Sequence, residues 1–274
     1  MAWSRNDPQP PSDTPAQPQR RRGRTGWLGF GVLGIKLGPK LAKVGLVGAS
    51  VAAYATLFTW QFAVLLVLAI LIHEWGHVVS MKRCGMPVKG IYLIPFVGGV
   101  AVGQAYADNR LTEAQNYEIA MMGPVFGLGS CIALLVPYWT TGDAFWGASA
   151  AAVALVNLFN LLPIFPLDGG RVLRSLFASA GRKPVLIGMG ASLLVTAGLL
   201  FWIGAPMLAV LLAIGVMEFW AEFRRGGTLG QPMSGLTIAA AILGYLGLAA
   251  VLFGVILAAG DTSGGAFAID ILRG

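Results

Sequence analysis

Charged residues are scarce in this chain. Lysine and arginine number 19 and aspartate and glutamate 12, so charged residues make up 11% of the 274 residues, against 56% hydrophobic residues. Soluble globular domains carry about 25% charged residues. The shortage excludes an ordinary soluble domain and predicts an all-α polytopic membrane protein.

Cysteine and histidine are rarer still, with two residues of each. Cys84 and Cys131 have neither the spacing of a Cys-x-x-Cys metal site nor the number that a disulfide framework needs, so we interpret them as unpaired thiols. The two histidines, His73 and His77, lie four residues apart in the stretch AILIHEWGHVVSMKRCG.

Long apolar runs occupy most of the sequence. A spanning helix needs about 17 to 25 apolar residues, and such runs cover 44–60, 61–81, 119–138, 144–162, 185–203, 205–222 and 236–259. The first run is short and joins the second through a tight turn. The sequence therefore predicts six or seven transmembrane helices, and the lipid bilayer as their surroundings.

The basic residues gather on one side of these predicted helices. With a cytoplasmic N-terminus, every lysine and arginine except Arg273 falls in a cytoplasmic segment, as the positive-inside bias requires. This distribution accounts for the net charge of +7, so no nucleic-acid partner is needed to explain it. We expect a multi-pass protein of a bacterial-type cell membrane.

The segments outside the transmembrane part are short. Residues 1–26 are rich in proline, glutamine and arginine and predict a disordered cytoplasmic tail. Residues 27–43 place lysines beside leucines at helical spacing, which predicts an interfacial amphipathic segment. We assign residues 44–260 to one transmembrane domain and residues 261–274 to a C-terminal tail.

One apolar segment is too interrupted to span. Residues 87–110 are interrupted by Pro95 and by a Gly-Gly pair flanked by β-branched and aromatic residues, a pattern that predicts a short hairpin or re-entrant loop. Irregular backbone at membrane depth must be buried in protein or line a wet cavity. The segment is therefore a candidate wall of a site.

The stretch HEWGH places three polar side chains where each costs a few kcal/mol. His73 and His77 share one helix face and can bind one metal ion, while Glu74 borders that face within reach of a metal-bound water. This is the arrangement of a zinc hydrolase, in which the glutamate takes a proton from a water that zinc has acidified. A chance motif of hydrogen-bonded core histidines would leave that cost unexplained.

A catalytic zinc usually has a third protein ligand. Without a further histidine a carboxylate is expected, and the candidates toward the cytoplasmic side are Asp108, Glu113, Glu118, Asp168, Glu218 and Glu222. Asp168 is distinguished by NLFNLLPIFPLDGGRVL, where Pro163 and Pro166 interrupt the helix and two glycines permit an unusual turn. Glu218 and Glu222 are its main rivals, although a charged helix end also explains them.

Two asparagines, Asn157 and Asn160, lie three residues apart just before this break. We interpret Asn157 as an interhelical hydrogen-bonding residue, a common role of asparagine in membranes. Asn160 is better placed to contact a substrate carbonyl or the developing oxyanion.

Three motifs together resemble a known family. HEWGH, the Gly-Pro of MMGPVFG at Gly123 and Pro124, and NLLPIFPLDGG are similar in order and spacing to the three-helix catalytic core of the site-2 proteases, which are intramembrane zinc metalloproteases. The resemblance covers about residues 61–175.

The resemblance implies one zinc ion bound by His73, His77 and Asp168, with Glu74 as general base and acid and Asn160 positioning the substrate backbone. It also implies an endopeptidase acting in or near a transmembrane segment of a membrane protein substrate. Such a segment must unwind before cleavage, and residues 91–102 could capture it as a strand edge.

Two other classes of function stay open on the sequence, a non-proteolytic scaffold or chaperone of the same fold and a metal transporter. The complete set of polar residues argues against the scaffold. The sequence contains no signal for the oligomeric state.

Overall fold

The computed structural model of this protein describes residues 42–96, 98–103, 111–224 and 229–260. The predicted tails, 1–26 and 261–274, and nearly all of the predicted interfacial segment lie outside the described residues.

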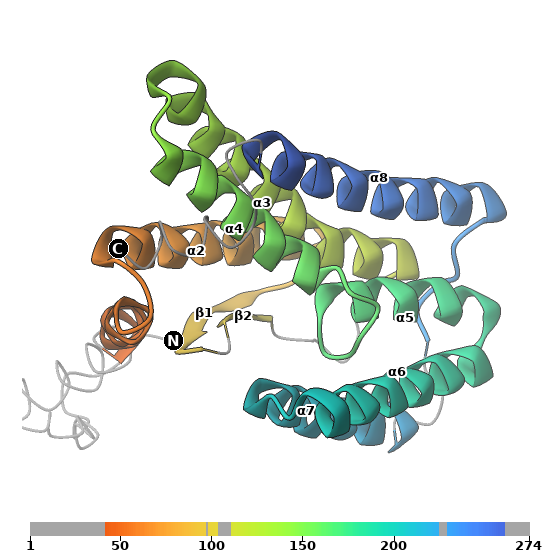
Figure 1. Cartoon of the computed structure of the whole chain (residues 1–274). Coiled ribbons are helices and arrows are strands. Elements are labelled where there is room, and N and C mark those ends of the chain that lie inside the picture. Colours follow the sequence, from red (N-terminus) through yellow and green to blue (C-terminus); the bar gives the residue numbers. More distant parts are fainter. Residues whose placement is uncertain (1–41, 97, 104–110, 225–228, 261–274) are drawn as a thin grey trace, which may run out of the picture. The chain divides into compact units, whose positions relative to one another are not determined.

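The described residues are mostly helical (Figure 1). A short helix, Ala42–Ala55, comes first. The labelled helices are α2 Trp60–Arg83, α3 Glu113–Thr141, α4 Ala144–Asn160, α5 Asp168–Ala180, α6 Arg182–Ile203, α7 Pro206–Arg224 and α8 Gly235–Gly260. Five of these, α2, α3, α6, α7 and α8, are long and apolar enough to cross a membrane, and Ala42–Ala55 and α4 are shorter apolar helices. Each predicted apolar run thus corresponds to one helix, and the polytopic membrane fold is confirmed.

Local side-chain chemistry defines where α3 begins and where α4 follows it. Thr112 and Gln115 form a capping box at the start of α3, in which each side chain accepts a hydrogen bond from the other residue's backbone N–H. Gly142 ends α3 in the left-handed conformation, and Asp143 caps α4 by accepting from the N–H of Phe145. So short a connection makes α3 and α4 antiparallel neighbours.

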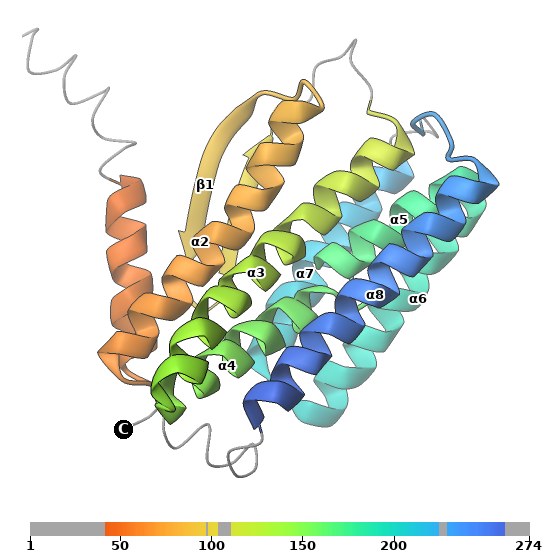
Figure 2. The ribbon, with the colours of Figure 1, turned by 90° about the horizontal axis from the view of Figure 1, so that it is seen from above.

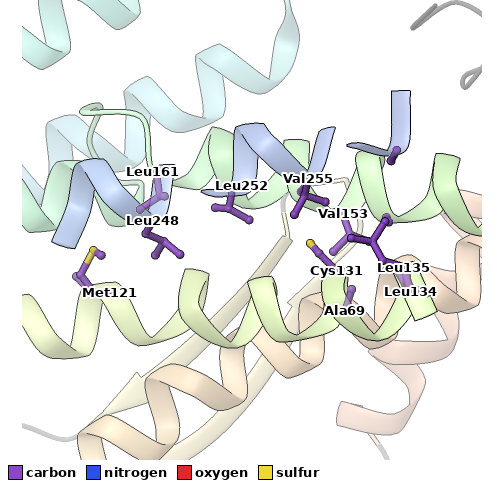
Figure 3. Packing of buried hydrophobic residues seen from close by; sticks show 14 of the residues in the cluster. Ala69, Met121, Cys131, Leu134, Leu135, Val153, Leu161, Leu248, Leu252 and Val255 are labelled. Atoms are coloured by element: carbon purple, nitrogen blue, oxygen red, sulfur yellow. The ribbon is translucent and has the colours of Figure 1, made fainter. Parts of the chain in front are cut away.

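Helices far apart in sequence pack side by side. Helix α3 lies between α2 and α4, α8 lies along α4 and α3, and α5 packs against α3 and α6 (Figure 2). Leu248, Leu252 and Val255 of α8 belong to the main hydrophobic cluster together with Cys131 of α3 and Val153 of α4 (Figure 3). Cys131 is fully buried and free, as expected of a packing thiol.

A two-stranded antiparallel hairpin lies against α2. Strand β1, Val88–Ile94, pairs with β2, Gly98–Gly103, in a register that sets Leu93 opposite Gly99. The predicted hairpin is confirmed, but its Gly-Gly pair is not the turn. The turn includes Phe96, whose φ of 62° is unusual for a non-glycine residue, and the two glycines begin β2.

Candidate metal centre

Helix α2 carries three buried side chains that can bind a metal ion in its second half. His73, Glu74 and His77 are only 5%, 6% and 4% exposed. One potential ligand atom from each lies within 4.8 Å of the others. The spacing in HEWGH therefore produces the single polar cluster that the sequence predicted on this helix.

Asp168, the first residue of α5, meets the two histidines. Its Oδ2 lies 3.0 Å from Nε2 of His73 and 3.3 Å from Nε2 of His77. The two Nε2 atoms are themselves 3.3 Å apart. Three potential ligand atoms from two helices thus converge on one point, and they belong to the three residues that the resemblance suggests as zinc ligands.

The loop between α4 and α5 brings Asp168 to this point. Helix α4 ends at Asn160, before the two prolines. Two outer helices then hold the loop: the N–H of Phe165 donates to Oγ of Ser192 on α6 at 2.8 Å, and the hydroxyl of Tyr245 on α8 donates to the carbonyl of Leu161. The loop is therefore anchored at both ends by helices outside α2 to α4.

Glycine is required at the two positions after Asp168 for a different reason from the one expected. Gly169 and Gly170 lie in the first turn of α5 without a positive φ, so the expectation of an unusual turn was wrong. A Cβ on Gly169 would overlap the carbonyl of Leu161, and one on Gly170 would lie too close to the carbonyl of Ile164. The pair is needed because the helix passes directly against the loop backbone.

Hydrogen bonds assign the imidazole tautomers. Nδ1 of His73 lies 2.8 Å from Oδ1 of Asn157, whose own Nδ2 donates to the carbonyl of Val153. Nδ1 of His77 lies 2.7 Å from the carbonyl oxygen of Ile119. Both partners are acceptors, so each Nδ1 carries the hydrogen and each Nε2 presents a lone pair.

The convergent atoms consequently fit a metal ion. Two nitrogen lone pairs and a carboxylate oxygen repel one another at such distances, and no hydrogen lies among them in these tautomers. A bound divalent cation would convert this repulsion into attraction, and nitrogen and oxygen donors of this kind are ligands of zinc.

Glycines leave room for the cluster. A Cβ on Gly123 of α3 would overlap the ring of His77 and approach the ring of His73. A Cβ on Gly99 of β2 would overlap the side chain of Glu74. The glycine of the Gly-Pro motif and the start of β2 are therefore packed directly against the polar residues.

The rival carboxylates are engaged elsewhere. Arg174 contacts Glu222 at 3.1 Å and Glu113 at 3.4 Å, and Arg171 lies 3.7 Å from Glu218. These ion pairs link α5 to α7 and to the start of α3. They explain the charged helix end without a metal.

The remaining predicted site residues lie outside the cluster or outside the described part of the chain. Glu118 accepts a hydrogen bond from Ser80 at 3.0 Å, and Asp108 lies outside the described residues. Asn160 is half-buried at the end of α4, and within the described part of the chain its amide forms no hydrogen bond with the cluster.

Asn157 is the residue whose importance the sequence reasoning missed. It forms the interhelical hydrogen bond that was expected, but its partner is His73. A polar residue in an apolar helix signals that a partner exists without naming it. The separation of 84 positions along the chain hides the connection.

Comparison with known proteins agrees with these motifs. The family model described as Peptidase family M50 matches residues 61–143 and 139–204. Rip3 of Mycobacterium tuberculosis strain H37Rv is 30% identical over 195 residues, which are 66% of this chain and 45% of Rip3. Zinc metalloprotease MJ0392 of Methanocaldococcus jannaschii is 29% identical over 50% of this chain and 40% of its own length.

A sporulation protein is also similar. Stage IV sporulation protein FB of Bacillus subtilis is 29% identical over 176 residues, which are 58% of each protein. The chain thus spans about half the length of these curated relatives. The family match covers more than half of this chain and includes His73, His77 and Asp168. The chain therefore belongs to peptidase family M50, the site-2 proteases.

Proposed function

We propose that this protein is a zinc-dependent endopeptidase that hydrolyses a peptide bond in or near a transmembrane segment of another membrane protein. The observation that carries the proposal is the convergence of two histidine nitrogens and an aspartate oxygen, 3.0 to 3.3 Å apart, beside a buried glutamate. The name of the relative MJ0392, a zinc metalloprotease, supports zinc as the metal.

Each residue of the cluster has a role in this reaction. His73, His77 and Asp168 hold one zinc ion, which when bound supplies the positive charge that acidifies a water and polarises a carbonyl. Glu74 accepts a proton from the attacking water and passes it to the departing amine nitrogen. Asn160 contacts the substrate carbonyl from the end of α4.

The basic residues give the proposed orientation. Lys82 and Arg83 form the last turn of α2, and basic residues favour the cytoplasmic side. His77 lies six residues before Arg83, or about 9 Å along a helix. The site would then face the cytoplasmic half of the cell membrane, and cleavage would release a fragment into the cytoplasm.

The hairpin is the proposed receiver of the unwound substrate. Lys43 of the helix Ala42–Ala55 contacts β1, with its Nζ donating to the carbonyl of Lys89 and lying over the ring of Tyr92. Strand β2 instead passes Glu74 at Gly99. A substrate strand added to the outer edge of β2 would therefore lie beside the general base.

Two neighbouring prolines test the hairpin. Successive residues of a strand direct their backbone groups to opposite sides, so Val100→Pro and Ala101→Pro remove different N–H groups, one facing β1 and one facing the free edge. The variant that removes the N–H facing the free edge should lower the cleavage rate by up to about 10-fold, the effect of one lost hydrogen bond. Its zinc content should be unchanged. The other should mainly lower thermal stability. Cleavage at the wild-type rate by both variants would exclude β2 as the receiving edge.

The test of the whole proposal combines zinc analysis with a membrane proteome comparison between cells producing wild type and Asp168→Ala. Wild type should contain one zinc per chain, whereas loss of a ligand should weaken zinc binding by more than about 100-fold. One or a few membrane proteins should then accumulate uncut in the variant cells.

Asp143→Asn is the matched control, because Asp143 caps α4 in the connection after α3 and the amide keeps the capping oxygen. Its zinc content and proteome should match wild type. A zinc-free wild type, or identical proteomes for wild type and Asp168→Ala under several stresses, would contradict the proposal.

A further inference from the structure

The side chain of Asn157 is held at both ends. Its Oδ1 accepts from Nδ1 of His73 at 2.8 Å, and its Nδ2 donates to the carbonyl of Val153 at 2.8 Å. Only one orientation of the amide satisfies both contacts. The side chain is 2% exposed, so no exchange with solvent competes with them.

Helix α3 closes the slot in which this amide lies. A Cβ on Gly127 would overlap Oδ1 and Cγ of Asn157. Gly127 lies one helical turn beyond Gly123, which leaves room for the histidine rings. The two glycines of GPVFG thus accommodate both the imidazoles and the asparagine behind them.

The two histidines are oriented by different means. His77 donates to a backbone carbonyl, that of Ile119, which side-chain substitution does not remove. His73 depends on the side chain of Asn157. Asn157 is therefore the point at which a single substitution can release one ligand without removing it.

We propose that Asn157 is a positioning residue for the metal. By accepting from Nδ1 of His73, it keeps the imidazole in the tautomer and ring orientation that aim Nε2 at Asp168 and His77. This role goes beyond the proposed protease function, because it concerns zinc affinity whatever reaction the zinc supports.

Two substitutions separate this role from a structural one. Asn157→Leu removes the acceptor at similar size. Asn157→Asp keeps an acceptor for Nδ1 of His73 but loses the N–H that donates to the carbonyl of Val153. If Asn157 were needed only for its bond to Val153 within α4, this substitution would remove its role. Asn160→Leu is the control for zinc affinity, because it makes the same chemical change three residues away.

The experiment measures zinc affinity of the purified full chain in detergent by competition with a chromophoric chelator. The expected result is 10- to 100-fold weaker zinc binding for Asn157→Leu, the usual effect of losing such a partner. Asn157→Asp should bind at least as tightly as wild type, and Asn160→Leu should match wild type. Thermal unfolding of the zinc-free proteins checks that each variant folds.

Other outcomes decide against the proposal. Wild-type zinc affinity in Asn157→Leu, or equal losses of affinity in Asn157→Leu and Asn157→Asp, would show that Asn157 is only an interhelical contact. If Asn157→Leu does not fold, Asn157→Ala makes the same comparison without adding apolar volume. A wild type that binds no zinc would instead contradict the proposed function, so the two failures are distinguishable.

Discussion

Glu74→Gln is expected to abolish peptide-bond hydrolysis while leaving zinc bound. Glutamine has nearly the same shape, so it fits against Gly99 of β2, where a Cβ would overlap the present side chain. It cannot accept the proton of the attacking water, and loss of a general base lowers a rate by about 10²- to 10⁴-fold. The three convergent atoms belong to other residues and remain in place.

The measurement is the cleavage rate of a membrane protein substrate, found by the proteome comparison, in vesicles containing the purified chain. Zinc per chain is determined on the same samples. Glu118→Gln is the matched control, because Glu118 contacts Ser80 outside the cluster and should retain both zinc and cleavage.

The outcome also separates the three classes of function. A scaffold or a metal transporter does not need a general base. A Glu74→Gln variant that still performs the protein's function in cells would therefore overturn the protease assignment. Loss of zinc together with cleavage would make Glu74 a ligand and contradict its proposed role.

Gly123→Ala is expected to eliminate zinc binding although glycine offers no ligand atom. The added methyl group would overlap the ring of His77 and crowd that of His73, so both rings must move. Loss of positioning by a small displacement can cost about 100-fold in activity, and here two ligands are displaced together. We expect zinc affinity to fall by more than the loss expected for Asn157→Leu.

Gly129→Ala on the same helix is the control. A Cβ there meets nothing within 4 Å, and alanine favours a helix over glycine by about 1 kcal/mol. This variant should keep its zinc and unfold at the same or a higher temperature. Gly123→Ala with wild-type zinc affinity would show that α3 yields to the methyl group and that the close fit has no role in binding.

Sequence reasoning predicted the features that depend on local periodicity. The scarcity of charge and the length of the apolar runs predicted a polytopic membrane fold, which the helices confirm. The four-residue spacing of His73 and His77 placed both rings on one helix face because the helical repeat is local. The prolines before Asp168 predicted the break after α4 for the same reason.

Tertiary structure decided which distant residues meet. Physical reasoning from the sequence left Glu218 and Glu222 beside Asp168 as candidates for the third metal ligand. Tertiary packing places these two glutamates in ion pairs with arginines instead. Asn157 and His73 are 84 residues apart, and His73 and Asp168 are 95 apart. No spacing rule connects such positions, because their contact depends on how α2, α3 and α4 pack and on the helices that hold the loop.

The glycines show the same division most clearly. The sequence correctly marked Gly169 and Gly170 as special, but their reason was assigned to backbone conformation, whereas the structure shows close approach of the loop carbonyls. The sequence alone tells where glycine occurs. Whether that glycine supplies a conformation or a space depends on the atoms that tertiary packing brings against it.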